Sequence, residues 1–122
     1  MKMNELIETI FSGFKVNGED IPVIYMYYMG HGEPYVVYMQ VYADNPLRAD
    51  DDLLAYADYY DFDVYAKGNF TQIVEQVIEK LTQSGFTYRP DRSSRDMYEV
   101  DTGYYHKTLN FSYHRSVMEE SE

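Results

Sequence analysis

Two carboxylates, Asp61 and Asp63, stand two residues apart between Tyr59 and Tyr65. Paired carboxylates could perform acid–base chemistry or, together with Asp58 and the aspartates at 50–52, bind a divalent cation. The spacing does not match an EF-hand loop, which needs a glycine at its sixth position and a closing glutamate. We therefore expect a solvated acidic surface here, with no metal site.

The other residues that could do chemistry lack the partners that catalysis needs. The chain has no cysteine, which excludes disulfides, thiolate ligands and cysteine nucleophiles. No serine lies in a Gly-x-Ser-x-Gly motif. His31 and Glu33 resemble the His-x-Glu of zinc deaminases, but that motif requires downstream cysteines. We expect a protein that is not an enzyme and that has no cofactor.

A strand must position the two carboxylates, because apolar residues alternate with them at period two. One face of this strand suits a core: Tyr60, Phe62, Val64 and Ala66. The other face combines carboxylates with tyrosine rings, which an ordinary solvated strand rarely needs, and is our candidate interface or channel lining: Tyr59, Asp61, Asp63 and Tyr65.

The rest of the chain predicts two helices and four further strands. A helix at 4–14 and a helix that begins after Asn69 and ends at Gly85 both carry an apolar stripe, and Asn69 with Gln72 resembles a capping box. Strands are expected at 23–29 and 35–42, joined as a hairpin, and at 86–89 and 104–113, with loops at 47–52 and 90–96. This predicts an α+β fold in the order α-β-β-β-α-β-β, with one mostly antiparallel sheet and both helices on one face. We expect residues 1–122 to form one domain with a flexible tail at 115–122.

The charge balance of the sequence limits the classes of partner that the protein can bind. The chain carries 21 acidic and 10 basic residues, for a net charge of −11, which opposes binding to phosphates. An acidic protein can still meet DNA by lining a conduit through which it slides, or by mimicking it. There is neither an apolar run that could span a membrane nor a signal peptide, so we expect a protein made and folded in the cytoplasm.

The 15 tyrosines exceed what a core of this size needs. Tyrosine is enriched at protein interfaces, so we interpret the surplus as contacts with other subunits; the alternative is a merely tyrosine-rich β-protein. A second candidate contact surface follows the turn at Asp101-Thr102-Gly103: Tyr105, His106 and Lys107. These side chains could complement Asp61 and Asp63 of a neighbour and so favour head-to-tail assembly; the alternative is an ordinary strand entry.

Five segments in combination resemble a known family. They are Ile21-Pro22-Val23, Tyr35-Val36-Val37-Tyr38, Ala49-Asp50-Asp51, Asp61-Phe62-Asp63-Val64-Tyr65-Ala66-Lys67-Gly68-Asn69 and Asp101-Thr102-Gly103-Tyr104-Tyr105-His106-Lys107-Thr108-Leu109. The sequence is similar to the tail-terminator (tail-completion) group of head–tail joining proteins, from siphophages and prophages of Gram-positive bacteria. None of these segments is an active-site signature.

The resemblance implies a structural virion protein with a small α/β sandwich fold. Such proteins form a hexameric ring on the last ring of the tail-tube protein, end its polymerisation and face the head-connector protein. DNA passes through the ring without specific binding. The expected location is the head–tail junction of the virion. The alternative reading is an acidic DNA mimic that inhibits a host DNA-binding or defence protein.

Overall fold

The computed structural model describes residues 3–28, 30, 32–43, 47–49 and 52–116. Its helices and strands follow one another along the chain as α1 (Met3–Ile10), β1 (Lys15–Val16), β2 (Glu19–Asp20), β3 (Val23–Tyr25), β4 (Tyr35–Ala43), β5 (Leu47–Ala49), β6 (Asp52–Ala66), α2 (Phe70–Gln83), β7 (Thr87–Tyr88), the 3₁₀ turn η1 (Pro90–Arg92), β8 (Met97–Glu99) and β9 (Tyr104–Ser116).

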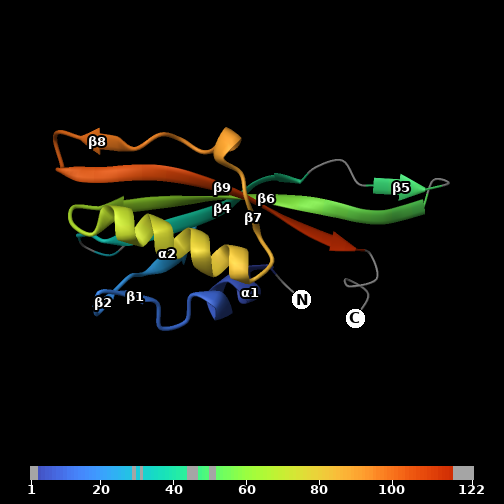
Figure 1. The fold of residues 1–122 in the computed structure, drawn as a ribbon, viewed down its shortest axis with the longest axis horizontal. Helices are drawn as coiled ribbons and strands as arrows, with labels where there is room; N and C mark the ends of the chain where they lie inside the picture. The colour runs from blue at the N-terminus through green and yellow to red at the C-terminus, as the bar shows by residue number, and fades with distance from the viewer. Residues whose placement is uncertain (1–2, 29, 31, 44–46, 50–51, 117–122) are drawn as a thin grey trace.

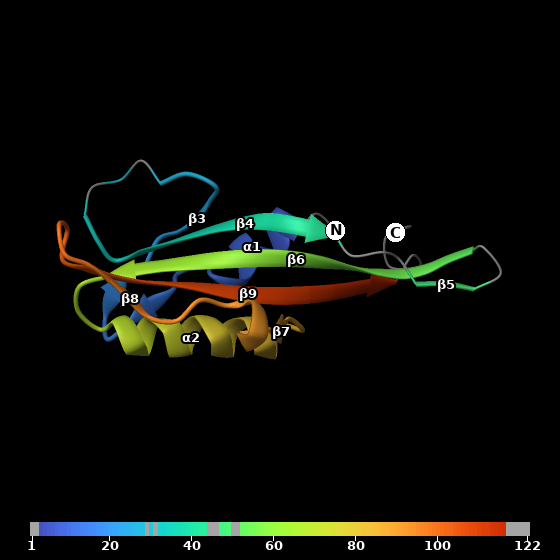
Figure 2. The same cartoon turned by 90° about the horizontal axis from the view of Figure 1, so that it is seen from above.

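The main sheet has the strand order β3-β4-β6-β9-β7, with β5 added to β6 and β8 added to β9 (Figures 1 and 2). Every pairing in it is antiparallel except that of β3 with β4. The long strands β6 and β9 pair continuously from Ala55 opposite Ser116 to Ala66 opposite Tyr105. A separate two-stranded sheet pairs β1 with β2, which the sequence did not predict.

The core lies between one face of the sheet and the two helices. Phe62 of β6 is fully buried at its centre, where the rings of Tyr38, Phe11 and Phe111 lie 5.3, 6.0 and 5.6 Å away between centroids. The apolar stripe of α2 covers the same face with buried Ile73, Val77 and Leu81. The α+β class, with a mostly antiparallel sheet and both helices on one face, is therefore confirmed.

The predicted hairpin between 23–29 and 35–42 is wrong. β3 ends at Tyr25, and β4 pairs with it in parallel, with Val23 beside Val36. The nine residues between the strands can span roughly 30 Å, several times the length of β3, so they carry the chain back to the start of β3. A hairpin needs a much tighter turn.

Several boundaries also differ from those predicted. α1 ends at Ile10, although Phe11 and Phe14 beyond it still pack into the core. The predicted loop at 47–52 contains β5 and the first residue of β6, because these residues pair with each other. β9 continues to Ser116, so the predicted flexible tail can begin only after that residue, and 117–122 lie outside the described residues.

The predicted capping box at the start of α2 is also wrong. Asn69 adopts a left-handed conformation (φ 57°) and its side chain makes no capping hydrogen bond. Its Oδ1 instead accepts a hydrogen bond of 3.4 Å from Nδ2 of Asn17, which also donates to Oε1 of Gln72 at 2.9 Å. The two side chains of the expected box therefore tie the β1–β2 turn to the helix.

Gly85 ends α2 as predicted, in a left-handed conformation (φ +98°). The N–H of Phe86 donates to the carbonyl of Leu81, and that of Gly85 to the carbonyl of Thr82. We expect Gly85→Ala to lower the free energy of unfolding by about 1–2 kcal/mol, because a side chain disfavours this conformation. A Cβ would meet only an ordinary contact, 3.5 Å from the Tyr113 ring, so the cost is conformational.

Urea unfolding would measure this change. Gly68→Ala is the matched control, because Gly68 has no positive φ and no neighbouring atom lies within 4 Å of the point where a Cβ would stand. Equal destabilisation by both substitutions would contradict the conformational explanation.

Candidate functional site on the helix-free face of the sheet

The face of the sheet opposite the helices carries the candidate residues of β6. Pairing registers bring three rows of side chains side by side on this face. They are Tyr35, Val37 and Met39 on β4, then Tyr59, Asp61, Asp63 and Tyr65 on β6, then His106, Thr108, Asn110 and Ser112 on β9. The face thus changes from apolar to acidic to neutral polar across the three strands.

Stacked rings cross one end of this face. Tyr28 stacks on Tyr35 at 4.3 Å between centroids, Tyr35 on Tyr65 at 4.8 Å, and Tyr65 on His106 at 4.1 Å. Burial raises the pKa of Tyr65 to about 12, with a further contribution from the nearby Asp63 carboxylate. Tyr35, Tyr65 and His106 thus hold three strands together through their stacked rings.

Each carboxylate of the acidic row accepts a hydrogen bond from the residue directly opposite on β9. Asn110 Nδ2 donates to Asp61 Oδ1 at 2.7 Å, and Thr108 Oγ1 donates to Asp63 Oδ1 at 2.5 Å. Burial raises the pKa of Asp61; the hydrogen bond from Asn110 opposes this shift, and the charge of Asp63 adds to it. The two carboxylates are therefore half-buried members of the sheet.

His106 lies between two carboxylates of its own chain. Its Nε2 is 3.7 Å from Asp63 Oδ1, and its Nδ1 is 4.0 Å from Glu99 Oε2 on β8. The predicted pairing of His106 with the acidic face thus occurs within one subunit. Within the described residues, no group of three or more His, Asp or Glu is placed to hold a metal ion.

Tyr105 and Lys107 lie on the opposite face of the sheet from Asp61 and Asp63, because β9 alternates. Lys107 Nζ is 3.2 Å from Oδ1 of Asp96 in the same chain. Tyr105 stacks on Phe70 at 5.5 Å between centroids. The structure therefore brings only His106 of the three predicted complements onto the acidic face.

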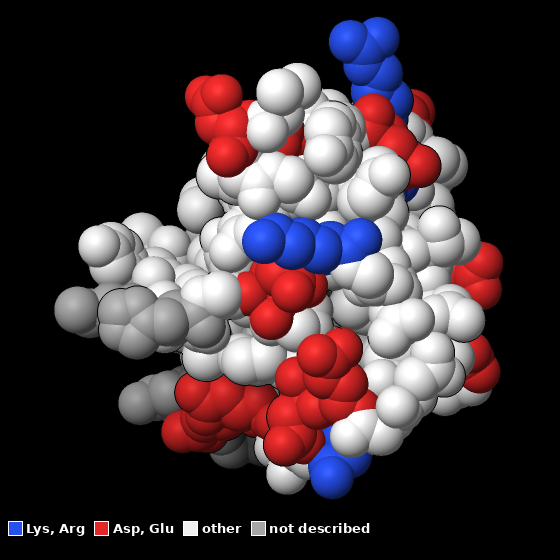
Figure 3. Space-filling view, turned by 90° about the vertical axis from the view of Figure 1, so that its left-hand side faces the viewer, with Lys and Arg blue, Asp and Glu red and all other residues white. Residues whose placement is uncertain are grey.

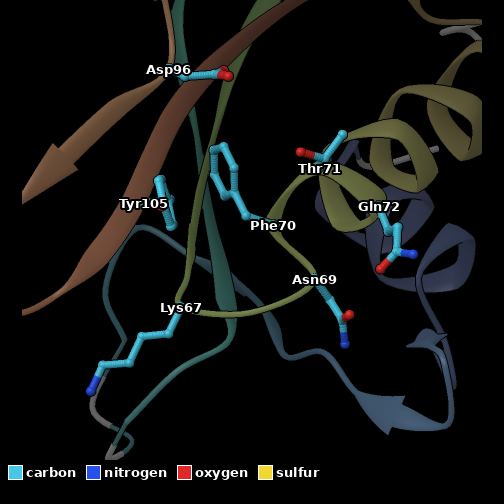
Figure 4. Close-up of a pocket in the computed structure, with 7 residues that line it drawn as sticks. All are labelled: Lys67, Asn69, Phe70, Thr71, Gln72, Asp96 and Tyr105. Atoms are coloured by element: carbon cyan, nitrogen blue, oxygen red, sulfur yellow. The ribbon is translucent and has the colours of Figure 1, made fainter.

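A groove of about 600 Å³ lies beside Tyr105, where α2 begins (Figure 4). Phe70 and Tyr105 lie side by side within it, and Lys67 extends away from them at its border (Figure 4). The lining residues are Lys67, Asn69, Phe70, Thr71, Gln72, Asp96 and Tyr105.

Tyr59 is not on the surface, although the sequence predicted an exposed position for it. Only 3% of the residue is exposed. The Arg92 guanidinium lies 4.6 Å from the centroid of its ring, and that of Arg89 lies 5.6 Å away. The predicted loop at 90–96 contains η1, which brings these arginines over the ring, so Tyr59 contributes to intrachain packing.

Sequence reasoning missed two apolar patches at the edges of the sheet. Among residues 3–28, 30, 32–41 and 57–114, every exposed large hydrophobic side chain belongs to one of them. Edge A, at β3 and β4, consists of Ile24, Tyr25, Met26, Tyr27 and Val41; edge B, at β8 and β9, consists of Tyr98, Val100 and Tyr105. Tyr27 is 68% exposed and Val100 83%. The unbroken run from Ile24 to Tyr28, without a charge, was the available signal for edge A.

Acidic side chains gather at the end of the molecule that contains β2 and the tip of β8, with few basic ones among them (Figures 1 and 3). The exposed acidic residues of these segments are Glu19, Asp20, Glu99 and Asp101. Both edges thus border an acidic end, so low ionic strength should oppose contact between copies of the chain.

The raised pKa of Asp61 predicts a pH effect on stability. Between the unfolded value, near 3.8, and the higher folded value, the folded state binds more protons, so stability falls as pH rises through this interval and stays lower above it. We expect Asp61→Asn to reduce this loss of unfolding free energy with rising pH and to be more stable than the wild type at pH 7. The amide oxygen of the new side chain can still accept the hydrogen bond from Asn110.

Urea unfolding between pH 3.5 and pH 7 would measure the difference. Asp20→Asn is the control, because the side chain of Asp20 is 81% exposed. A parallel pH dependence in wild type and Asp61→Asn would contradict the assignment to Asp61.

No protein-family model matches the chain, and none of the curated proteins matches it. Neither described helix is long and apolar enough to cross a membrane.

Proposed function

We propose that this protein forms a ring at the head–tail junction of a siphophage virion, where it ends polymerisation of the tail tube and joins the tail to the head connector. The observation that carries the proposal is the presence of two unlike apolar edges, A and B, on opposite sides of one sheet. Contact between unlike surfaces joins copies head to tail, and a closed ring satisfies both surfaces on every copy. The resemblance of the sequence supports the same assembly, with six subunits.

The charge of the chain is consistent with this role. A protein with a net charge of −11 repels DNA, so DNA could slide through a ring without binding to it. Asp61 and Asp63 lie on the helix-free face, which would provide a lining of low affinity for phosphates. The partners would be other copies of the chain, the tail-tube protein and the head-connector protein.

Mixing the purified protein with tail tubes tests the proposal. Negative-stain electron microscopy should show a ring at one end of each tube, and further tube growth from added tail-tube protein should stop at capped ends. Mass photometry should show hexamers, either alone or on contact with tubes, and more of them at about 0.5 M salt than at low salt. A protein that stays monomeric under all these conditions and leaves tube growth unchanged would overturn it.

The acidic end favours a second candidate, a DNA mimic that inhibits a DNA-binding protein (Figure 3). Such a mimic needs carboxylates spaced like phosphates along an exposed face, but Asp61 and Asp63 are half-buried and hydrogen-bonded within the sheet. Direct competition distinguishes the two functions. A mimic should displace DNA from a host nuclease or repressor and should leave tail tubes uncapped.

A further inference from the structure

Both apolar edges contain a strand with an open side. Among the described residues, β3 pairs only with β4, and β8 pairs only with β9. The outer N–H and C=O groups of an edge strand can pair with another chain. Neither of these short strands contains a proline or a lysine, which commonly block such pairing, and their one charged side chain, Glu99, lies 4.0 Å from His106 of its own chain.

The directions of the strands allow the two edges to pair with each other. β3 is parallel to β4, both β4 and β9 are antiparallel to β6, and β8 is antiparallel to β9. It follows that β3 and β8 run in opposite directions. If one copy is placed beside another in the same orientation, β8 of the first and β3 of the second therefore form an antiparallel pair, the more stable arrangement.

The two strands also lie near the same end of the sheet, on its opposite sides (Figure 2). Val23 pairs with Val36, and Val36 pairs with Val64 of β6, so Val23 and Val64 lie at the same position along the strand direction. Met97 pairs with His106, and His106 pairs with Tyr65, the residue that follows Val64 in β6. Met97 and Tyr65 therefore also lie at the same position along the strand direction. From these starts the two strands run in opposite directions. A neighbouring copy must therefore be displaced along the strands by about four residues, roughly 13 Å, to bring Tyr25 of β3 opposite Tyr98 of β8.

We propose that a second copy of the chain continues the sheet, with β8 of one subunit paired to β3 of the next. The contact buries edge A of one copy against edge B of its neighbour. This inference rests on the proposed self-assembly and identifies the surfaces that form it. A two-fold dimer would bury only one kind of edge and leave the other exposed, whereas this contact buries both.

The groove beside Tyr105 completes the contact. In an antiparallel pair, the end of β3 lies near the start of β8, and Asp96, which precedes β8, lines the groove. The chain turns sharply after β3, where the N–H of Tyr27 donates to the carbonyl of Tyr25 at 2.7 Å. We assign Tyr27 of the neighbour as the ring that enters the groove and packs on Phe70 and Tyr105.

Disulfide crosslinking tests the contact directly, because the chain has no cysteine. Tyr25 and Tyr98 are suitable sites: both lie on the helix side of the sheet, beside Tyr38 and Tyr105 respectively. On oxidation, the double variant Tyr25→Cys/Tyr98→Cys should give a ladder of covalent multimers on a denaturing gel. Each single variant should stay monomeric, and an equimolar mixture of the two should stop at dimers.

The pattern of products decides the outcome. Dimers from either single variant would indicate a two-fold contact and overturn the proposal, as would failure of the double variant to crosslink while it still forms rings or caps. Ser12→Cys/Glu79→Cys, with both sites exposed on the helix side, is the control and should give no ladder. Met26→Cys/Val100→Cys is a second edge pair, for use if circular dichroism shows that the first variant is misfolded, and its failure would count equally.

The result also separates the inference from the proposed function. A ladder from a protein that never caps tail tubes would support the edge contact and contradict the function at the head–tail junction. Capped tubes without any ladder would support that function and contradict the contact.

Discussion

Phe62→Ala should lower the free energy of unfolding by about 3–5 kcal/mol, because it removes a fully buried ring and leaves a cavity. The ring lies at the point where the sheet meets both helices, between Phe11 after α1, Tyr38 of β4 and Phe111 of β9. These neighbours belong to different elements and cannot easily close the gap together. A domain of this size has a total stability of about 5–15 kcal/mol, so much of the population should unfold under mild denaturant.

Urea unfolding followed by circular dichroism would measure the loss. Phe62→Leu should cost much less, because it keeps most of the buried volume. Tyr27→Ala should leave the monomer unchanged within about 0.5 kcal/mol, because that side chain is 68% exposed. A loss of less than about 1 kcal/mol for Phe62→Ala would contradict the placement of this ring at the centre of the core.

The sequence predicted the elements that are long and strongly periodic. Alternation identified the central part of β6 and of β9, and the apolar stripe together with Gly85 identified α2. In these segments the local pattern and the burial agree, because each has one face on the same core. The fold class followed from these three elements and the first helix.

The pairing of strands was harder to predict from the sequence, because it depends on contacts between residues that are far apart in the chain. Nothing local in 23–42 distinguishes a hairpin from the parallel pair that forms. Asn69 has the residue type of a cap, but it meets Asn17, 52 residues away. Tertiary contacts of this kind override local preference.

At the candidate site, too, the sequence predicted the local pattern but not the contacts between distant residues. Period two placed Asp61 and Asp63 together on one face, and the pairing register confirms this placement. Their hydrogen-bond donors, Asn110 and Thr108, are 49 and 45 residues away, so only the register reveals them. The exposure of edges A and B is equally non-local, because it depends on which strands end the sheet.

Tyr98→Asp should weaken self-association by roughly 30-fold or more, because burying one unpaired charge in an interface costs about 2 kcal/mol or more. The new carboxylate would lie at edge B beside Glu99 and Asp101, where like charges add to the cost. Tyr98 is 55% exposed in the single subunit, so its fold should be preserved. Sedimentation or mass photometry over a range of concentrations would measure the change.

Introducing a pair of opposite charges, one on each edge, tests whether edge B contacts edge A. If Tyr98 of one copy faces Tyr25 of the next, Tyr25→Lys should restore part of the association lost in Tyr98→Asp, because the two new charges would meet between subunits. Tyr98→Phe should associate like the wild type, since it keeps the ring. Restoration by Tyr25→Lys but not by Glu79→Lys, which adds a positive charge on the exposed side of α2, would place the partner surface at edge A. Equal restoration by both would show that net charge alone governs the association and would contradict the paired edges.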